Sequence, residues 1–250
     1  MVKNLRVLCL HGFRTSGSFL QKQISRWDSS ITEKLDMCFL DGPYPAQGKS
    51  EIEAIFPAPY FEWFQFEKDF TEYTNLDKAF AFIVDYMEKN GPFDGLLGFS
   101  QGATLSAALV GYQRKGLMLK NHPPVRFIIS ISGSKFRDPE MCEILYSPPI
   151  KCPTVHLIGA KDWLKLPGEE LMQAFENPLL IAHPQGHLVP RLDKEAVGIL
   201  NGFLESLMKE ESAEKLENGN MFHRFISDES AEIGQSQVSD NCSKKEMASI

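Results

Sequence analysis

The stretch Phe93-Asp94-Gly95-Leu96-Leu97-Gly98-Phe99-Ser100-Gln101-Gly102 decides the fold. Its first half is an apolar run typical of a buried strand, and an alanine-rich segment typical of a helix follows the glycine-serine turn. The pentapeptide Gly98-Phe99-Ser100-Gln101-Gly102 fits the pattern G-x-S-x-G, a sharp elbow that exposes a serine between a strand and a helix. The pattern alone is weak, but this context favours Ser100 as a nucleophile over a structural turn.

Further apolar runs, each bounded by turn residues, alternate with helical patterns on both sides of the elbow. Such alternation predicts a mainly parallel central sheet of about six strands, flanked by helices on both faces. Helices are expected over residues 18–28 and 193–208, and a third follows Asn75 as its N-cap. The other strands are expected at residues 5–10, 35–40, 125–133, 153–159 and 178–183.

Residues 44–70 interrupt this alternation with several prolines and a cluster of aromatic residues. The segment is too long for an ordinary loop, so we expect an insertion over the carboxyl edge of the sheet, where α/β proteins bind ligands. Its aromatic side chains are expected either to line an apolar pocket for an acyl group or to form the insertion's own small core. The residues concerned are Phe56, Tyr60, Phe61, Trp63 and Phe64.

Composition separates a body, residues 1–208, from a tail, residues 209–250. The chain has 250 residues and a net charge of −7, and the tail holds five basic against nine acidic residues. The tail is expected to be disordered. A short docking segment at residues 222–226 is the alternative, and the sequence does not separate the two.

Charge, hydropathy and cysteines exclude several classes of partner. No basic stripe indicates nucleic-acid binding, and no apolar run reaches the length of a membrane span. The start of the chain lacks the pattern of a signal peptide. Five scattered cysteines argue against a disulfide framework and favour a reducing, cytoplasmic setting.

A serine nucleophile needs a base, and the base needs an acidic partner that orients it. In strand–elbow–helix hydrolases these residues follow the serine in the order acid, then histidine, on loops after later strands. His187 lies in such a loop, whereas His183 ends the last predicted strand, so His187 is the preferred base. Asp162 follows the strand at 153–159 and is the preferred acid, with Asp138 as its competitor.

The tetrahedral intermediate of acyl transfer needs two N–H donors. The elbow supplies one, the backbone N–H of Gln101. The first predicted strand ends at His11-Gly12, and the backbone N–H of Phe13 is the expected second donor. The neighbouring Arg14 is expected to be a solvated surface charge, with a role in binding a substrate carboxylate as the alternative.

Four motifs together resemble the FSH-type serine hydrolases, a family that includes the ovarian-cancer-associated esterase-like proteins. They are Leu10-His11-Gly12-Phe13, Gly98-Phe99-Ser100-Gln101-Gly102, Gly159-Ala160-Lys161-Asp162 and Gly186-His187-Leu188-Val189-Pro190. The likeness covers about residues 3–208. It implies a compact α/β-hydrolase fold, hydrolysis of carboxylic esters, and no metal or organic cofactor.

By this resemblance Ser100 is the nucleophile, Asp162 the orienting acid and His187 the base. The family also implies a preference for longer acyl chains, which would suit the aromatic insertion. One departure is the strand count, since full α/β-hydrolases have eight strands and the sequence shows six. Two other kinds of function stay open: a ligand-binding protein without catalysis on the same scaffold, and a scaffold that acts through the acidic tail.

Overall fold

The computed structural model of the chain describes residues 3–67 and 70–210. The chain divides into two compact units, Met1–Leu204 and Glu205–Ile250. Nearly all of the predicted tail, with its apolar segment 222–226, lies outside the described residues. The boundary at residue 208 and the disorder of the tail therefore stay predictions.

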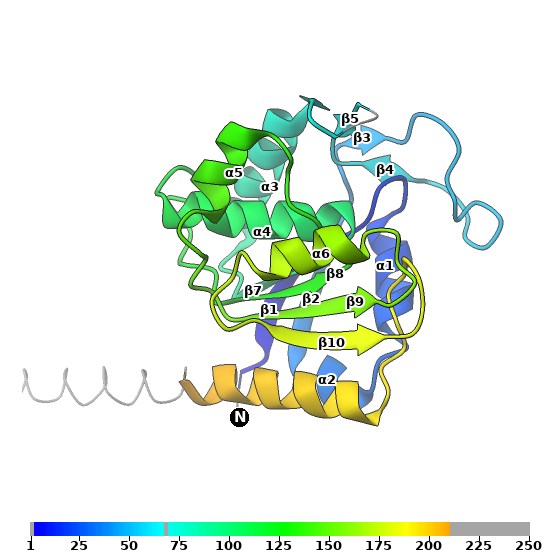
Figure 1. The fold of residues 1–250 in the computed structure, drawn as a ribbon. Helices are drawn as coiled ribbons and strands as arrows, with labels where there is room; N and C mark the ends of the chain where they lie inside the picture. The colour runs from blue at the N-terminus through cyan, green and yellow to red at the C-terminus, as the bar shows by residue number, and fades with distance from the viewer. Residues whose placement is uncertain (1–2, 68–69, 211–250) are drawn as a thin grey trace, which may run out of the picture. The chain divides into compact units, whose positions relative to one another are not determined.

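A six-stranded parallel sheet forms the centre of the first unit (Figure 1), in the spatial order β10-β9-β8-β7-β1-β2. Every residue of β7, β8 and β9 is buried, which explains why the central strands read as unbroken apolar runs. All six strands fall on the predicted runs. They are β1 (Leu5–Leu10), β2 (Leu35–Leu40), β7 (Gly95–Phe99), β8 (Phe127–Ile131), β9 (Thr154–Gly159) and β10 (Leu179–His183).

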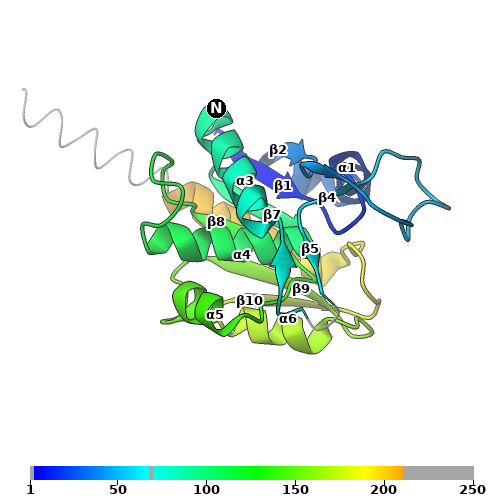
Figure 2. The same cartoon turned by 90° about the horizontal axis from the view of Figure 1, so that it is seen from above.

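Helices cover both faces of the sheet (Figure 2), as the sequence predicts. The chain runs from β1 outward to β2, then returns across β1 to β7 and continues to β10. Because crossovers between parallel strands are right-handed, this reversal puts the helices between β2 and β10 on the opposite face from those before β2. One face carries α3 (Leu76–Asn90), α4 (Gln101–Arg114), α5 (Pro139–Tyr146) and α6 (Lys165–Met172); the other carries α1 (Gly17–Ile24), α2 (Ser29–Thr32) and residues 194–204 of a helix over 194–210.

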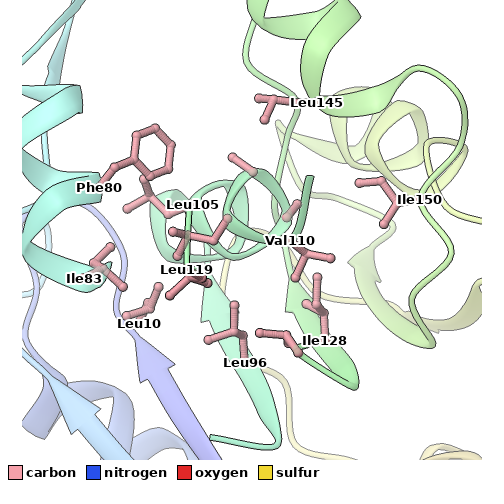
Figure 3. Packing of buried hydrophobic residues seen from close by; sticks show 14 of the residues in the cluster. Leu10, Phe80, Ile83, Leu96, Leu105, Val110, Leu119, Ile128, Leu145 and Ile150 are labelled. Carbon is pink, nitrogen blue, oxygen red and sulfur yellow. The ribbon is translucent and has the colours of Figure 1, made fainter. Parts of the chain in front are cut away.

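A hydrophobic core cluster lies between the sheet and the helices on the α3–α6 face (Figure 3). Leu96 and Ile128 point from β7 and β8 towards α4, and Phe80 and Ile83 of α3 pack on the same cluster. Leu105 of α4 is fully buried among them. The elbow helix is thus apolar around nearly its whole circumference because it is covered on every side.

The insertion after β2 contains two short antiparallel ladders and precedes α3. One ladder pairs β3 (Tyr44–Pro45) with β4 (Phe61–Glu62), and the other pairs β5 (Gln65–Phe66) with β6 (Tyr73–Thr74). Phe61 also bridges to Thr15 in the loop after β1. The insertion is thereby joined to the carboxyl edge of the sheet, as predicted from its position.

Several helical features differ from expectation: the helix expected over residues 18–28 ends at Ile24, and a separate short helix, α2, follows at Ser29. Asn75 precedes α3 but has a φ of 63° and makes no capping hydrogen bond; its side-chain amide donates to Gln65 instead. Two short helices, α5 and α6, were not expected, because eight residues give little periodicity to detect. Among the helices in the described part of the chain, none has the length and hydropathy to cross a membrane.

Candidate active site

The strand order places two loops side by side at the carboxyl edge of the sheet. β1 and β7 are neighbours, yet the chain leaves β1 towards β2 and leaves β7 towards β8. The loops after two such strands diverge and leave a crevice, which is where open α/β sheets bind ligands. The His11-Gly12-Phe13 loop and the serine elbow form the two sides of this crevice.

The elbow has the backbone geometry that the motif requires. Ser100 has φ 53° and ψ −116°, a positive φ that is uncommon for a residue with a side chain. Its backbone N–H still extends the sheet by donating to Ile131 O at 2.9 Å, and α4 begins at the next residue. Strain of this kind persists where the surrounding structure fixes it, and it holds the Ser100 side chain above the sheet edge.

Close packing explains both glycines of the elbow. A Cβ on Gly98 would lie 2.4 Å from the backbone of Gly102 and Ala103. A Cβ on Gly102 would lie 2.1 Å from the carbonyl oxygen of Leu10, in β1. Both contacts are with backbone, which cannot move aside as a side chain can, so the turn has no room for larger residues.

Ser100, His187 and Asp162 lie in one hydrogen-bonded line. His187 Nε2 is 2.9 Å from Ser100 Oγ, and His187 Nδ1 is 2.9 Å from Asp162 Oδ1. A carboxylate can only accept, so Nδ1 carries the proton and Nε2 is free to accept from the serine hydroxyl. The same Asp162 oxygen accepts from the Leu164 N–H at 2.8 Å, which holds the carboxylate in place.

Hydrogen bonds join the loops that carry Asp162 and His187 to each other and to the rest of the first unit. The Lys161 N–H donates to Gln185 O at 3.0 Å, which joins the loop after β9 to the loop after β10. The Trp27 indole donates to Pro190 O at 2.9 Å and anchors the far side of the second loop. The His187 ring is also flanked by the rings of Phe99 and Trp163, at 5.1 and 5.0 Å.

The competing candidates take other positions. Asp138 is the N-cap of α5, where its carboxylate accepts from the Met141 N–H at 2.8 Å, the role expected of an acid before Pro139. His183 ends β10, buried, and burial lowers its pKa. The structure thus brings together the preferred residues and leaves both competitors out of the line.

The two predicted oxyanion donors are the backbone N–H groups of Phe13 and Gln101. The Gln101 N–H begins α4, where the first donors of a helix lack intrahelical acceptors. Within residues 3–67 and 70–210, neither the Gln101 N–H nor the Phe13 N–H has a hydrogen-bond acceptor in the protein. The Gln101 side chain reaches away to the insertion and donates to Phe64 O at 2.9 Å.

His11 is a structural residue of the first loop. Its Nε2 accepts from the Gly42 N–H at 2.9 Å, so the ring proton is on Nδ1, which donates to Gly12 O at 2.7 Å. Burial lowers the pKa of His11 to about 4, although the Gly12 carbonyl acts in the opposite direction. The ring is therefore neutral at physiological pH and joins the first loop to the start of the insertion.

We expect the protein to lose stability as the pH falls from about 6.5 to about 4. Burial also lowers the pKa of His156 in β9 to about 4. Between these pH values the histidines of the unfolded chain are protonated, whereas His11 and His156 of the folded protein stay neutral. The free energy of unfolding therefore falls with pH below 6.5, by about 1.4 kcal/mol per pH unit for each fully buried histidine. Urea unfolding at a series of pH values measures the slope.

The variant His156→Gln has one titrating histidine fewer and is expected to show a shallower decline between pH 6 and pH 4.5. An unchanged slope in His156→Gln would contradict the assignment of this pH dependence to buried neutral histidines.

A cavity of about 600 Å³ opens directly above Ser100. Its wall is largely apolar and comes from the first loop, the insertion and the loops after β7, β8, β9 and β10. One side carries Phe13, Phe64, Phe66, Phe70, Tyr73 and Phe136, whose rings contact one another. Ile52, Ile55, Trp163 and Leu188 are further apolar wall residues, and Ile55 and Trp163 are exposed.

Of the five aromatic residues predicted to line a pocket, Phe64 belongs to the cavity wall. Trp63 is fully buried instead and donates from its indole to His11 O at 2.9 Å. Tyr60 donates to Phe56 O, Phe56 packs against Phe19, and Phe61 pairs in β4. These four residues are outside the cavity wall, and they do not form a separate core of the insertion either, because Trp63 and Phe61 pack on His11 and Phe56 packs on Phe19 of α1.

Arg14 is neither a free surface charge nor an unpaired anion receptor. Its Nε donates to Glu62 Oε1 at 2.7 Å, and Glu62 is fully buried. The carboxylate also accepts from the Gln65 side chain at 2.8 Å and the Gln47 N–H at 3.2 Å. The sequence gives no sign of this pairing because 48 positions separate the partners.

Residues 1–199 match the family described as serine hydrolase (FSH1), so the chain belongs to this family. Esterase OVCA2 from Bos taurus is 29% identical over 206 residues, which are 74% of this chain and 89% of that protein. A dihydrofolate reductase from Schizosaccharomyces pombe is 30% identical over 228 residues, 84% of this chain. The chain spans about half the length of that relative, 49%.

Solved structures show the same fold at low identity. Acyl-protein thioesterase 2 from Zea mays has a TM-score of 0.54 and 16% identity, covering 83% of this chain and 95% of that one. SOBER1 from Arabidopsis thaliana has a TM-score of 0.53 and 16% identity, covering 82% and 99%. The predicted α/β-hydrolase fold and serine hydrolase family are confirmed, and the esterases among the relatives support ester hydrolysis as the reaction.

Proposed function

We propose that this protein hydrolyses carboxylic esters or thioesters of apolar acyl groups through an acyl-enzyme intermediate on Ser100. The observation that carries the proposal is the hydrogen-bonded line from Asp162 through His187 to Ser100, at the floor of an apolar cavity. A serine hydroxyl becomes a useful nucleophile when a positioned base takes its proton.

In the first half-reaction Ser100 Oγ attacks the acyl carbon while His187 Nε2 takes the hydroxyl proton. Asp162 keeps the ring in the correct tautomer and stabilises the imidazolium that forms. The N–H groups of Phe13 and Gln101 bind the oxyanion of the tetrahedral intermediate. His187 then gives its proton to the leaving alcohol or thiol.

In the second half-reaction water attacks the acyl-enzyme. His187 takes a proton from the water, the same two N–H groups bind the second oxyanion, and the acid product leaves as Ser100 recovers its proton. No step requires a metal or an organic cofactor. Among the described residues, no group of three or more His, Cys, Asp or Glu side chains is placed to hold a metal ion.

The aromatic side of the cavity is the proposed acyl site. Phe64, Tyr73 and Phe136 form a set of mutually contacting rings with centroids 5.0 to 5.7 Å apart. Each methylene of an acyl chain that leaves water for such a surface contributes about 0.8 kcal/mol. The specificity constant should therefore rise with acyl length until the cavity is filled.

The test of the function combines labelling by a fluorophosphonate probe with hydrolysis of p-nitrophenyl esters of increasing acyl length. Labelling and turnover together would support the serine hydrolase reaction, and a rising kcat/KM would support the acyl site. Absence of both would contradict the proposal and favour the predicted alternative, ligand binding without chemistry. Turnover with a flat length profile would contradict only the acyl site.

Replacing Phe66 by alanine should weaken the preference for long acyl chains. Phe66 is a wall residue whose ring lies 5.1 Å from that of Phe13 and 4.6 Å from that of Phe70. We expect kcat/KM for a decanoyl ester to fall about tenfold in Phe66→Ala, as for other losses of apolar contact in a pocket, with little change for the acetyl ester. Phe82→Ala, an exposed position on α3, is the control. Equal losses for both esters would argue against a role in acyl binding.

We also propose a cytoplasmic location and a small-molecule ester as the substrate. Cys9, Cys38, Cys142 and Cys152 are free thiols, which suits a reducing compartment. The net charge of −7 disfavours binding to nucleic acid.

A further inference from the structure

The peptide between Gly12 and Phe13 is held by more hydrogen bonds than a simple turn requires. The Gly12 carbonyl oxygen accepts from His11 Nδ1 at 2.7 Å, from Thr15 Oγ1 at 2.8 Å and from the Thr15 N–H at 3.3 Å. Thr15 Oγ1 also lies 3.3 Å from His11 Nδ1, so the three groups converge on one oxygen.

The direction of the Phe13 N–H follows from these bonds. The C=O and N–H of a trans peptide are coplanar and point in opposite directions. Donors gathered on the Gly12 carbonyl therefore fix the line along which the Phe13 N–H points. The proposed oxyanion donor and the carbonyl that Thr15 holds are two ends of the same rigid plane.

Three other backbone carbonyls of this loop also accept hydrogen bonds. His11 O accepts from the Trp63 indole at 2.9 Å, and Thr15 O accepts from the Phe61 N–H at 2.7 Å. Arg14 O accepts from the Ser50 hydroxyl at 2.6 Å. The carbonyls of His11, Gly12, Arg14 and Thr15 thus all accept hydrogen bonds, while the Phe13 N–H is left without an acceptor in the described part of the chain.

We propose that Thr15 is a positioning residue, whose hydroxyl sets the Phe13 N–H to bind the oxyanion. This inference rests on the proposed function. Rotation of the Gly12–Phe13 peptide would redirect the Phe13 N–H, but it would also break all three hydrogen bonds to the carbonyl of Gly12, a buried residue. Thr15 makes two of these hydrogen bonds. The one from its hydroxyl, at 2.8 Å, is the shorter, and a conservative substitution can remove it.

Thr15 allows a cleaner test than His11. The His11 ring also accepts from Gly42, so its removal would disturb the start of the insertion as well. Thr15 is 8% exposed, and valine reproduces its shape without the hydroxyl. Thr154 in β9, 1% exposed, is a matched buried threonine outside the cavity wall.

The experiment compares Thr15→Val, Thr15→Ser and Thr154→Val with the wild type in p-nitrophenyl ester hydrolysis. We expect kcat to fall about ten- to a hundredfold in Thr15→Val with KM nearly unchanged, because a misdirected donor weakens binding of the transition state alone. Thr15→Ser retains the hydroxyl and should restore most of this loss. Thr154→Val should match the wild type.

A second measurement uses a trifluoromethyl ketone, whose adduct with Ser100 carries an oxyanion. Its affinity should fall in Thr15→Val by about the same factor as kcat/KM, as expected for an analogue of the transition state. Thermal unfolding of each variant checks that the fold is kept, and Thr15→Ala provides a second variant without the hydroxyl if valine prevents folding.

The outcomes separate this inference from the proposed function. A wild type without turnover would refute the function itself. An active wild type with unchanged kcat in Thr15→Val, or with a raised KM and unchanged kcat, would overturn the positioning role alone. Equal losses in Thr15→Ser and Thr15→Val would also overturn it, because the hydroxyl would then not be the group that matters.

Discussion

Ser100→Ala is expected to abolish labelling by a fluorophosphonate and to lower kcat for p-nitrophenyl esters by about 10⁴-fold or more. The proposed reaction forms a covalent bond to Ser100 Oγ, and alanine leaves no atom to form it. His187 Nε2 would lose its partner at 2.9 Å, while the cavity and the two N–H donors would stay in place. Binding of the ester should therefore survive, so the loss should appear in kcat.

Ser106→Ala is the matched control for this experiment. Ser106 lies in the same helix, is fully buried and donates its hydroxyl to Gly102 O at 2.8 Å. Loss of the Ser106 hydroxyl should leave labelling of the protein intact and reduce its stability slightly. Turnover by Ser100→Ala close to that of the wild type would refute Ser100 as the nucleophile and direct attention to another group in the cavity.

Asp162→Asn should lower kcat by about 10³- to 10⁴-fold while the protein stays folded. The Asp162 carboxylate accepts from His187 Nδ1, and this leaves Nε2 free to accept the serine proton. An asparagine amide can donate to Nδ1 and so favour the tautomer with the proton on Nε2. The imidazolium formed during the reaction would also lose its negative partner.

Asp138→Asn provides the comparison, because Asp138 was the competing acid in the sequence. Asn caps a helix about as well as Asp, so α5 should keep its N-terminal hydrogen bond and activity should not change. Kinetics and thermal unfolding of both variants decide the matter. A large loss in Asp138→Asn with little effect in Asp162→Asn would reverse the assignment.

The strands could be predicted from the sequence because each is a short apolar run with turn residues at both ends. The run at 35–40 coincides with β2, and the runs at 153–159 and 178–183 extend β9 and β10 by one residue. The order of elbow, acid loop and histidine loop along the chain was enough to select Ser100, Asp162 and His187 as candidates. The parallel sheet brings loops from successive strands to one edge, so chain order carried spatial information.

The cavity wall could not be predicted in the same way. Consecutive residues of the insertion turn to opposite sides: Trp63 is buried under the first loop, while Phe64 faces the cavity. The wall also draws on Phe136, which lies after β8 and far from the insertion in sequence. Aromatic content indicates burial but not direction, and only the fold determines which rings meet.

Thr15 and Glu62 were missed for a related reason. A threonine in a loop and a glutamate in an insertion are ordinary surface residues by composition. Their roles come from contacts that form only in the folded protein. Thr15 Oγ1 donates to the backbone oxygen of Gly12, and Glu62 pairs with the charged side chain of Arg14. Polar residues of this kind give no periodic signal in a sequence.

The hydrogen bonds between the first loop and the insertion bear on how the substrate range of such an enzyme can change. Trp63, Phe61 and Glu62 all hold residues of the loop that carries the Phe13 N–H, and the adjoining chain supplies part of the wall of the proposed acyl site. A new insertion grafted from a relative would bring a new wall but would also remove the supports of the loop. A change in substrate specificity through the insertion therefore requires matching changes in the first loop. We expect the two segments to change together during evolution.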